Sequence, residues 1–394
     1  MAYSMHQWST LSQNYPASSI RKMAKRAREI GNPIMLTMGE PNFETPDFIK
    51  QAAIQGINEN RTYYGPNVGE HNFQTAVADK YTKMTGFQFE PDNIMASFGA
   101  TEGILLVMMS VLNEGDEVLV SNPHYPNYLG QIMSVGAQAV DVPVYEKNQF
   151  KIQAADIEAA ITDKTKLLII NSPNNPLGSI LDREDYEAIL AVADKHKITI
   201  LSDEVYENII YDGKEHVSLF QIPGASENHF VVNSFSKTYA MTGWRAGYVV
   251  GHKQAIHVMA EFREGIGFAV APFTQDAAVA ALESDQTIVR EYLQAYDERR
   301  HIVVDGLNAI PGFTCLKTEG AFYAFPNIQA FNKSSEAFAM ELLEHTHVAI
   351  TPGSAFGSMG EGYLRISFAQ STEDLKEAIS RIGEYVARAY PELH

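Results

Sequence analysis

Polar and aromatic side chains follow five apolar runs of the sequence, each at the point where a run ends. They occur in the segments 99–101, 122–125, 172–175, 203–206 and 236–237. If the apolar runs are parallel strands of one sheet, their carboxyl ends lie along one edge, where open α/β sheets bind ligands. One cleft would then contain a lysine, an acid, amides, hydroxyls and an aromatic ring, which could bind a small molecule and act on it.

Part of this set fits a phosphate group. The candidate phosphate ligands are Gly99, Ala100, Thr101, Ser234, Ser236 and Arg245. The first three open a predicted helix, where free backbone N–H groups and a hydroxyl can bind an anion. The other three add two hydroxyls and a guanidinium, which suits phosphate better than an ammonium does.

The remaining residues fit the ring of pyridoxal 5′-phosphate, so we expect this cofactor. Lys237 can form an imine with its aldehyde. Asp203 can lie against the pyridine nitrogen, because a buried carboxylate beside a protonated ring nitrogen stays ionised. Asn175 and Tyr206 can donate hydrogen bonds to the phenolic oxygen. The predicted catalytic residues are therefore Lys237, Asp203 and Tyr206.

The elements that must position these residues are predicted by apolar runs rich in Val and Ile, which alternate with helical patterns over about 91–251. The expected strands are 93–98, 117–121, 139–144, 166–171, 198–202, 229–234 and 246–250. Several runs, such as LLII and ITIL, are continuous rather than alternating, which indicates strands covered on both faces. We expect an α/β fold with a mostly parallel seven-stranded sheet between helices.

A smaller α+β domain is expected after the sheet region. A long helix over 287–310 is followed by β runs at 313–317, 321–325, 348–352 and 363–369, and by helices at 335–345 and 372–389. The large domain is expected to cover 45–285. The segments 1–44 and 286–394 would form the small domain, which is discontinuous in sequence.

Length and composition narrow the class of protein. The chain has 394 residues, more than the ~250–300 at which single cores tend to split. Its net charge of −18 argues against nucleic-acid binding, which uses clustered Lys and Arg. No stretch has the character of a signal peptide or a membrane span, so we expect a cytoplasmic protein without a membrane partner. One cysteine and no metal-ligand spacing of histidines predict no metal site.

The stretch SKTYAMTGWRAGY, at 236–248, resembles the lysine motif of the class I/II aminotransferases, pyridoxal-phosphate enzymes of fold type I. Other stretches resemble that family's motifs in the family's order: MGEPNFETP, YYGPNVG, FGATEG, NPHYPNY, NSPNNPLG, SDEVYE, EGAFYAF, TPGSAFG and YLRISFA. The resemblance spans about 39–369. It implies an aminotransferase that moves an amino group from an L-α-amino acid to a 2-oxo acid by a ping-pong mechanism.

The resemblance also implies roles for single residues. Lys237 resembles the lysine that binds the cofactor covalently and then moves the proton. Arg365 in YLRISFA resembles the arginine that pairs with the substrate α-carboxylate through a guanidinium fork. Asn175 and the backbone of Gly39 are expected to contact the same carboxylate.

Two tyrosines complete the implied site. Tyr125 is expected to stack on the pyridine ring. Tyr64 resembles a tyrosine that reaches the phosphate of the neighbouring subunit, which implies a homodimer with shared active sites. His124 could lie against the cofactor or be a polar loop residue, and it is not assigned a role.

Two other functions remain open at this point. The first is β-elimination from a sulfur amino acid on the same fold, and the second is a non-catalytic binding or regulatory protein. Taken singly, each candidate residue is more simply a surface charge, a turn former or a core aromatic, so the prediction rests on their conjunction. Some family members specific for aspartate carry a lysine where this chain reads GATEG, so we expect no strict preference for dicarboxylates.

Overall fold

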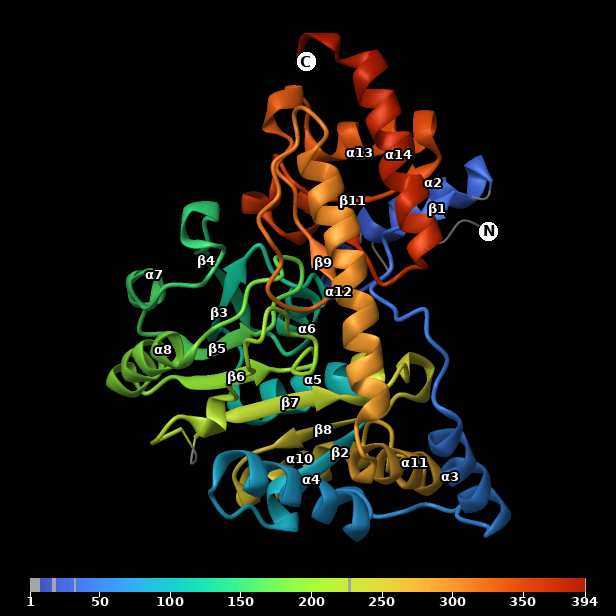
Figure 1. Cartoon of the computed structure of the whole chain (residues 1–394). Coiled ribbons are helices and arrows are strands. Elements are labelled where there is room, and N and C mark those ends of the chain that lie inside the picture. Colours follow the sequence, from blue (N-terminus) through green and yellow to red (C-terminus); the bar gives the residue numbers. More distant parts are fainter. Residues whose placement is uncertain (1–7, 16–18, 32, 226–227, 394) are drawn as a thin grey trace.

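The computed structural model describes residues 8–15, 19–31, 33–225 and 228–393. A seven-stranded sheet crosses the molecule in the order β2-β8-β7-β6-β5-β3-β4 (Figure 1). Its strands are β2 Ile94–Ser97, β3 Glu117–Asn122, β4 Gln138–Pro143, β5 Thr165–Asn171, β6 Thr199–Asp203, β7 Phe230–Ser234 and β8 Gly247–Val250. β8 is antiparallel to both neighbours, and the other pairs are parallel. The predicted sheet is confirmed, with every strand within one residue of its expected bounds.

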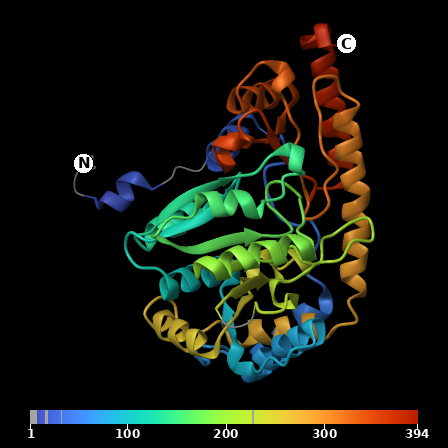
Figure 2. The same ribbon diagram turned by 90° about the vertical axis from the view of Figure 1, so that its left-hand side faces the viewer.

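Helices cover both faces of this sheet, as the continuous apolar runs require. Successive residues of a strand point to opposite faces, so Leu167 and Ile169 of β5 join one core while Leu168 and Ile170 join the other. The first core is completed by α5 Gly99–Val111, α6 Asn127–Ser134 and α10 Lys253–Glu264. The second is completed by α3 Asp47–Asn58, α4 His71–Thr85, α7 Ala154–Ala160, α8 Arg183–His196 and α11 Pro272–Glu283. Figure 2 shows the sheet between these layers.

The long helix α12, Thr287–Asn308, runs from the sheet region to a second group of elements (Figure 1). This group contains β9 Tyr323–Ala324, β10 Val348–Ala349, β11 Thr351–Pro352, β12 Leu364–Ser367, α13 Ser335–Thr346 and α14 Thr372–Ala389. β12 pairs antiparallel with β9 and β11. The predicted α+β character of this part of the chain is confirmed.

The strand expected at 313–317 is not formed, so this prediction is wrong. Only Thr314 makes an isolated bridge, to Asn327. The reason lies at the end of α12, where the Asn308 side chain accepts from the backbone N–H of Cys315 and donates to its carbonyl, at 2.8 and 2.9 Å. Because these bonds occupy the backbone groups that a neighbouring strand would need, the segment stays irregular.

Residues 34–36, shortly before Gly39, join the second group. β1, Ile34–Met35, pairs in parallel with β10, and the carbonyl of Leu36 accepts from Ser367 N at 2.9 Å. The remaining helices are α1 Thr10–Asn14, α2 Ser19–Ile30 and α9 Phe235–Thr238. Residues distant in sequence are thereby brought to the rim of the central sheet. Within the described ranges, no helix has the length and apolar character needed to cross a membrane.

Candidate active site

The predicted site residues gather at one edge of the central sheet. β2, β3, β5, β6 and β7 run in the same direction, so all five carboxyl ends lie there. β8 runs the opposite way, so its start at Gly247, two residues after Arg245, reaches the same edge. Lys237 lies on the short helix α9 immediately after β7. The loop before the antiparallel strand β8, which carries Arg245, therefore lies at the same edge as the ends of the five parallel strands.

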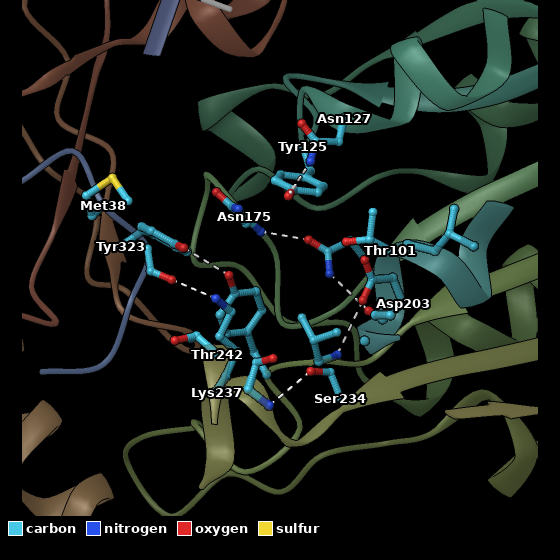
Figure 3. Close-up of a pocket in the computed structure, with 18 of the residues that line it drawn as sticks. Met38, Thr101, Tyr125, Asn127, Asn175, Asp203, Ser234, Lys237, Thr242 and Tyr323 are labelled. Atoms are coloured by element: carbon cyan, nitrogen blue, oxygen red, sulfur yellow. Dashed lines mark hydrogen bonds between the residues drawn. The ribbon is translucent and has the colours of Figure 1, made fainter. Parts of the chain in front are cut away.

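These residues surround one cavity of about 440 Å³ (Figure 3). All the predicted site residues except Tyr64 line it: Gly39, Gly99, Ala100, Thr101, Tyr125, Asn175, Asp203, Tyr206, Ser234, Ser236, Lys237, Arg245 and Arg365. In Figure 3, Asp203 and Ser234 come from the sheet, whereas Met38 and Tyr323 approach from the other side. The cavity lies between the sheet edge and the second group of elements.

Lys237 carries an amine without a carboxylate partner. Its Nζ donates a hydrogen bond to the carbonyl of Gly39 at 2.6 Å, and no ion pair joins it to any residue that the structure describes. Burial lowers the pKa of Lys237 to about 8, and the nearby Glu40 opposes this only in part. A substantial fraction of this amine is therefore neutral near pH 8.

Asp203 is the last residue of β6 and is buried. Its Oδ2 accepts a hydrogen bond from the Tyr128 hydroxyl at 2.6 Å, and its Oδ1 accepts from Val205 N at 3.4 Å. Burial raises the pKa of Asp203 to about 6, although the Tyr128 bond favours the ionised form. A cation against this carboxylate would restore its charge.

Arg365, on β12, is a buried guanidinium that contacts only neutral groups. It donates to Asn175 Oδ1 at 3.1 Å and to the carbonyl of Thr37, and it lies over the Tyr323 ring at 4.6 Å. Its Nε is buried without a hydrogen-bond partner. Burial lowers the pKa of Arg365, and none of the described carboxylates pairs with it. An incoming carboxylate would supply the missing charge.

A turn at Gly99 forms the opposite wall. Gly99 has φ +73°, and a Cβ there would lie 2.7 Å from Arg245 Nη2, so glycine is required. Arg245 donates to the carbonyls of Thr242 and Phe98 at 2.8 and 3.1 Å. α5 begins at this turn, and the first N–H groups of a helix have no partner within it. The turn thus combines free donors with a fixed cation.

Tyr206 and Tyr323 meet at the centre of the cavity wall. Their hydroxyl oxygens lie 2.9 Å apart and are buried. A Cβ on Gly39 would lie 2.0 Å from the Tyr323 hydroxyl, so only glycine fits there. Tyr323 therefore shapes the place where the Gly39 backbone meets the cavity.

The sequence profile of the family described as aminotransferase class I and II matches residues 32–382. The chain belongs to this family. It is 41% identical to an aspartate aminotransferase of Pyrococcus horikoshii and 38% identical to aromatic-amino-acid aminotransferase 2 of Thermococcus litoralis. These matches cover 93% of this chain in both cases, with 93% and 94% of the relatives. The crystal structure of an aromatic aminotransferase from Pyrococcus horikoshii matches with a TM-score of 0.89 and 38% identity, over 93% of this chain and 99% of that one.

Tyr64 is the predicted aminotransferase residue that lies outside the cavity. Its side chain is 83% exposed and stacks on Phe268, with ring centroids 5.0 Å apart. No contact among the described residues joins the Tyr64 side chain to the Gly99 turn. Its expected role toward a neighbouring subunit therefore stays a prediction.

Several cavity residues of this aminotransferase were not predicted from the sequence. They include Thr37, Asn127, Asn171, Thr242 and Tyr323. Tyr128 was not predicted either; it does not line the cavity but donates a hydrogen bond to Asp203. Asn171 could have been found, because it ends an expected strand, and its Nδ2 donates to the Asp203 carbonyl at 2.9 Å. Tyr323 lies inside the quoted EGAFYAF motif. His124 is buried with Nδ1 3.1 Å from the Tyr125 carbonyl, and it is not among the residues lining the cavity.

A second buried charged set lies next to Asp203 but outside the cavity. We name it the Glu204 cluster: Lys80, Glu204, Glu207, His216 and Tyr248. Glu204, Glu207 and His216 each offer one atom that could bind a metal ion, and these three atoms lie within 4.8 Å of one another. However, Lys80 pairs with Glu207, and Glu204 Oε1 already accepts from Ser202 and Leu219 N. These acids are satisfied by protein donors, so the cluster gives no reason to assign a metal.

Proposed function

We propose that this aminotransferase moves an amino group from an L-α-amino acid to a 2-oxo acid, using pyridoxal 5′-phosphate held in the cavity. One observation carries the proposal: an amine without a carboxylate partner, a carboxylate without a cation and a guanidinium without an anion face one cavity. Each lacks the opposite charge that an amino acid and this cofactor would bring.

The Gly99 turn fits the cofactor phosphate. Its free N–H groups, the cation of Arg245 and the hydroxyls of Ser234 and Ser236 are the donors that a phosphate takes. Glycine at position 99 supports this assignment, because a Cβ there would lie 2.7 Å from Nη2 of Arg245, the guanidinium proposed to bind the phosphate.

Other residues of the cavity fit the cofactor ring. Asp203 would pair with the protonated pyridine nitrogen, which would bring its pKa back down from about 6. Tyr206 and Asn175 would donate to the phenolic oxygen, and Tyr125 would lie on the ring face. The donor set and its order around the cavity support pyridoxal 5′-phosphate.

Lys237 would hold the cofactor covalently and, once displaced by the substrate amine, act as general base. The cofactor, when bound, supplies an electron sink for the electron pair left at Cα. Lys237 Nζ must be neutral to take the Cα proton, and its pKa of about 8 allows this near neutral pH. Once protonated, the same Nζ would also be the group that gives this proton back.

Arg365 would bind the α-carboxylate of both substrates. Its two Nη atoms form a fork, and Asn175 orients one of them. The Gly39 backbone lies beside the same position. Because a 2-oxo acid has the same carboxylate as the amino acid it replaces, one group can serve both halves of a ping-pong reaction.

The cavity supports a broad range of amino donors. The cationic residues in its described lining are Lys237, Arg245 and Arg365, and each has a role above. No further cation of the described lining remains for a second carboxylate. Ile104 and Tyr125 offer apolar surface instead. We therefore expect neutral and aromatic donors to be used at least as well as dicarboxylates.

A homodimer with shared sites is part of the proposal. Tyr63 and Tyr64 are 80% and 83% exposed, and Tyr64 stacks on Phe268, which is also exposed. Such an apolar surface suits a contact between subunits. We also infer that 45–285 form the cofactor domain and that 1–44 join 286–394, which the pairing of β1 with β10 supports.

A half-reaction without acceptor tests the function. The purified protein loaded with pyridoxal 5′-phosphate is mixed with a panel of amino acids. We expect release of the matching 2-oxo acid in an amount equal to the sites present, with a change in visible absorbance. Lys237→Ala serves as the inactive control.

The same experiment separates the alternatives. Catalytic release of pyruvate and ammonia from cystathionine without a 2-oxo acid would indicate β-elimination instead. A protein that binds the cofactor but releases no 2-oxo acid would indicate a binding protein. The relatives quoted above are all named aminotransferases, which supports amino transfer over β-elimination.

A further inference from the structure

A buried ion pair lies behind the Gly99 turn, outside the cavity lining. Arg263, in the last turn of α10, donates from Nη2 to Glu102 Oε2 at 2.8 Å. Glu102 lies in the first turn of α5. The side chains are 0% and 10% exposed, so this pair is almost fully removed from water. Such pairs add little net stability by themselves, which calls for another reason for their presence.

The pair holds the residue that precedes Gly99. Glu102 Oε2 also accepts from Phe98 N at 2.7 Å, and the Arg263 guanidinium lies 4.9 Å from the centre of the Phe98 ring. The carbonyl of Phe98 accepts from Arg245 Nη2 at 3.1 Å. Both polar groups of Phe98 are therefore occupied, one by Glu102 and one by the arginine proposed to bind phosphate.

Arg263 also fixes the strand that leads into this turn. Its Nη1 donates to the carbonyl of Ala96 on β2 and, at 2.9 Å, to the carbonyl of Asn67. The end of β2, the Phe98 backbone and the start of α5 are thus held from behind by one guanidinium and one carboxylate. The orientation of the Gly99, Ala100 and Thr101 N–H groups depends on this support, since those groups begin the helix directly after Phe98.

We propose that Glu102 and Arg263 are positioning residues for the cofactor phosphate, acting through the Phe98 backbone and the Gly99 turn. The inference rests on the proposed function, because it takes the turn as the phosphate site. Glu102 would repel a phosphate if it were unpaired, and Arg263 neutralises that charge. The pair can therefore orient the donors without opposing the anion that they bind.

The test compares two ligands that differ only in the phosphate. Dissociation constants of pyridoxal 5′-phosphate and of pyridoxal are measured by absorbance on the full-length protein freed of cofactor. The Kd of pyridoxal divided by the Kd of pyridoxal 5′-phosphate gives the contribution of the phosphate to binding. A smaller ratio means a smaller contribution. Glu102→Asp keeps the charge but is one methylene too short to reach Phe98 N and Arg263 together. Glu102→Gln keeps the length and an acceptor oxygen.

We expect Glu102→Asp to reduce the ratio about tenfold, the size of one lost hydrogen bond to a charged group. Pyridoxal binding should change less than about twofold, and Glu102→Gln should keep the ratio of the wild type. Asp212→Asn is the matched control, because Asp212 also pairs with a buried arginine, Arg300, at 2.8 Å. It should lower the thermal midpoint and leave the ratio unchanged.

Three results would overturn the inference. They are an unchanged ratio in Glu102→Asp, an equal loss of both ligands, or a loss in Glu102→Gln as large as that in Glu102→Asp. If the wild type itself binds both ligands equally, the phosphate site is wrong and the proposed function fails at that step. If the wild type prefers the phosphate and Glu102→Asp keeps that preference, only the positioning role is wrong.

Discussion

The cavity and the Glu204 cluster are neighbours, and each contains a lysine and an acid. The charged groups of the cluster have partners of opposite charge within the described part of the protein, whereas those of the cavity do not. In the cluster, Lys80 pairs with Glu207 and donates to the Tyr248 hydroxyl at 2.8 Å. Burial of Lys80 is outweighed by Glu207, so the pKa of Lys80 is raised. In the cavity, Lys237 has only a carbonyl partner, and burial lowers its pKa to about 8.

The adjacent residues Asp203 and Glu204 repeat the contrast. Asp203 faces the cavity with one hydroxyl and one distant N–H as donors, and burial raises its pKa to about 6. The Glu204 carboxylate accepts hydrogen bonds from Ser202 Oγ and from Leu219 N. It also lies 3.0 Å from His216 Nε2. The difference indicates that partners supplied by the fold make a buried charge structural, while a missing partner leaves it free to act on a ligand.

The largest expected effect separates the two lysines. Lys237→Met should lower the rate of amino transfer by about 10⁴-fold, because the proposed general base is lost, without lowering the free energy of unfolding. Lys80→Met should lower that free energy by about 3 kcal/mol, because Glu207 is left buried and unpaired. Steady-state kinetics and urea unfolding measure the two quantities. Equal kinetic losses in both variants would remove the distinction.

Substitutions of the adjacent acids Asp203 and Glu204 should also differ, one affecting kcat and the other stability. Asp203→Asn should lower kcat by about 10³-fold, because the pyridine nitrogen of the proposed cofactor would lose the carboxylate that we propose keeps it protonated. Glu204→Gln should leave kcat within about threefold and reduce stability by about 2 kcal/mol, since three donors face its carboxylate. A large kinetic loss in Glu204→Gln would contradict the assignment of Glu204 to structure.

The pH dependence of stability in the cofactor-free protein gives a third comparison. The folded state raises the pKa of Asp203 from 3.8 to about 6, so it binds the proton more tightly than the unfolded state does. Stability from this group is therefore lost as pH rises from about 4 to 6. Asp203→Asn should match the wild type near pH 3 and exceed it by about 3 kcal/mol at pH 8 in urea unfolding. A difference that does not depend on pH would show that Asp203 has an ordinary pKa.

Lys237 should produce the complementary slope at higher pH. Its pKa falls from 10.5 to about 8 on folding, so the unfolded state holds the proton more tightly. Stability of the cofactor-free protein should consequently rise between pH 8 and 10.5, and this rise should be absent in Lys237→Met. The same unfolding series measures it.

The smallest expected effect concerns two buried tyrosines. Tyr128→Phe removes the hydroxyl that donates to Asp203 at 2.6 Å, so kcat should fall about tenfold and its acid limb should move to higher pH. Tyr186→Phe removes a hydroxyl 3.3 Å from Ser202 Oγ, near the Glu204 cluster, and should leave the pH profile unchanged. An identical profile in Tyr128→Phe would show that this hydroxyl does not tune Asp203.

Sequence alone predicted the central sheet because continuous apolar runs such as 167–170 have few structural alternatives. The gathering of Asp203, Asn175 and Lys237 followed from the rule that parallel strands end at one edge. Contacts across long separations could not be predicted, such as Tyr128 with Asp203 or Glu102 with Arg263, which lies 161 residues further along the chain. The false strand at 313–317 had the right composition, but the Asn308 side chain occupies its backbone groups.

The hydrogen bond from Arg365 to the Thr37 carbonyl joins residues 328 positions apart. During synthesis on the ribosome, the groups that we assign to the cofactor and to its positioning, up to Arg263, are translated well before Arg365 is. A nascent chain can therefore assemble the cofactor pocket while the arginine assigned to the substrate is still untranslated. Maturation of the site would then proceed in a set order, with cofactor loading possible before the enzyme can recognise an amino acid.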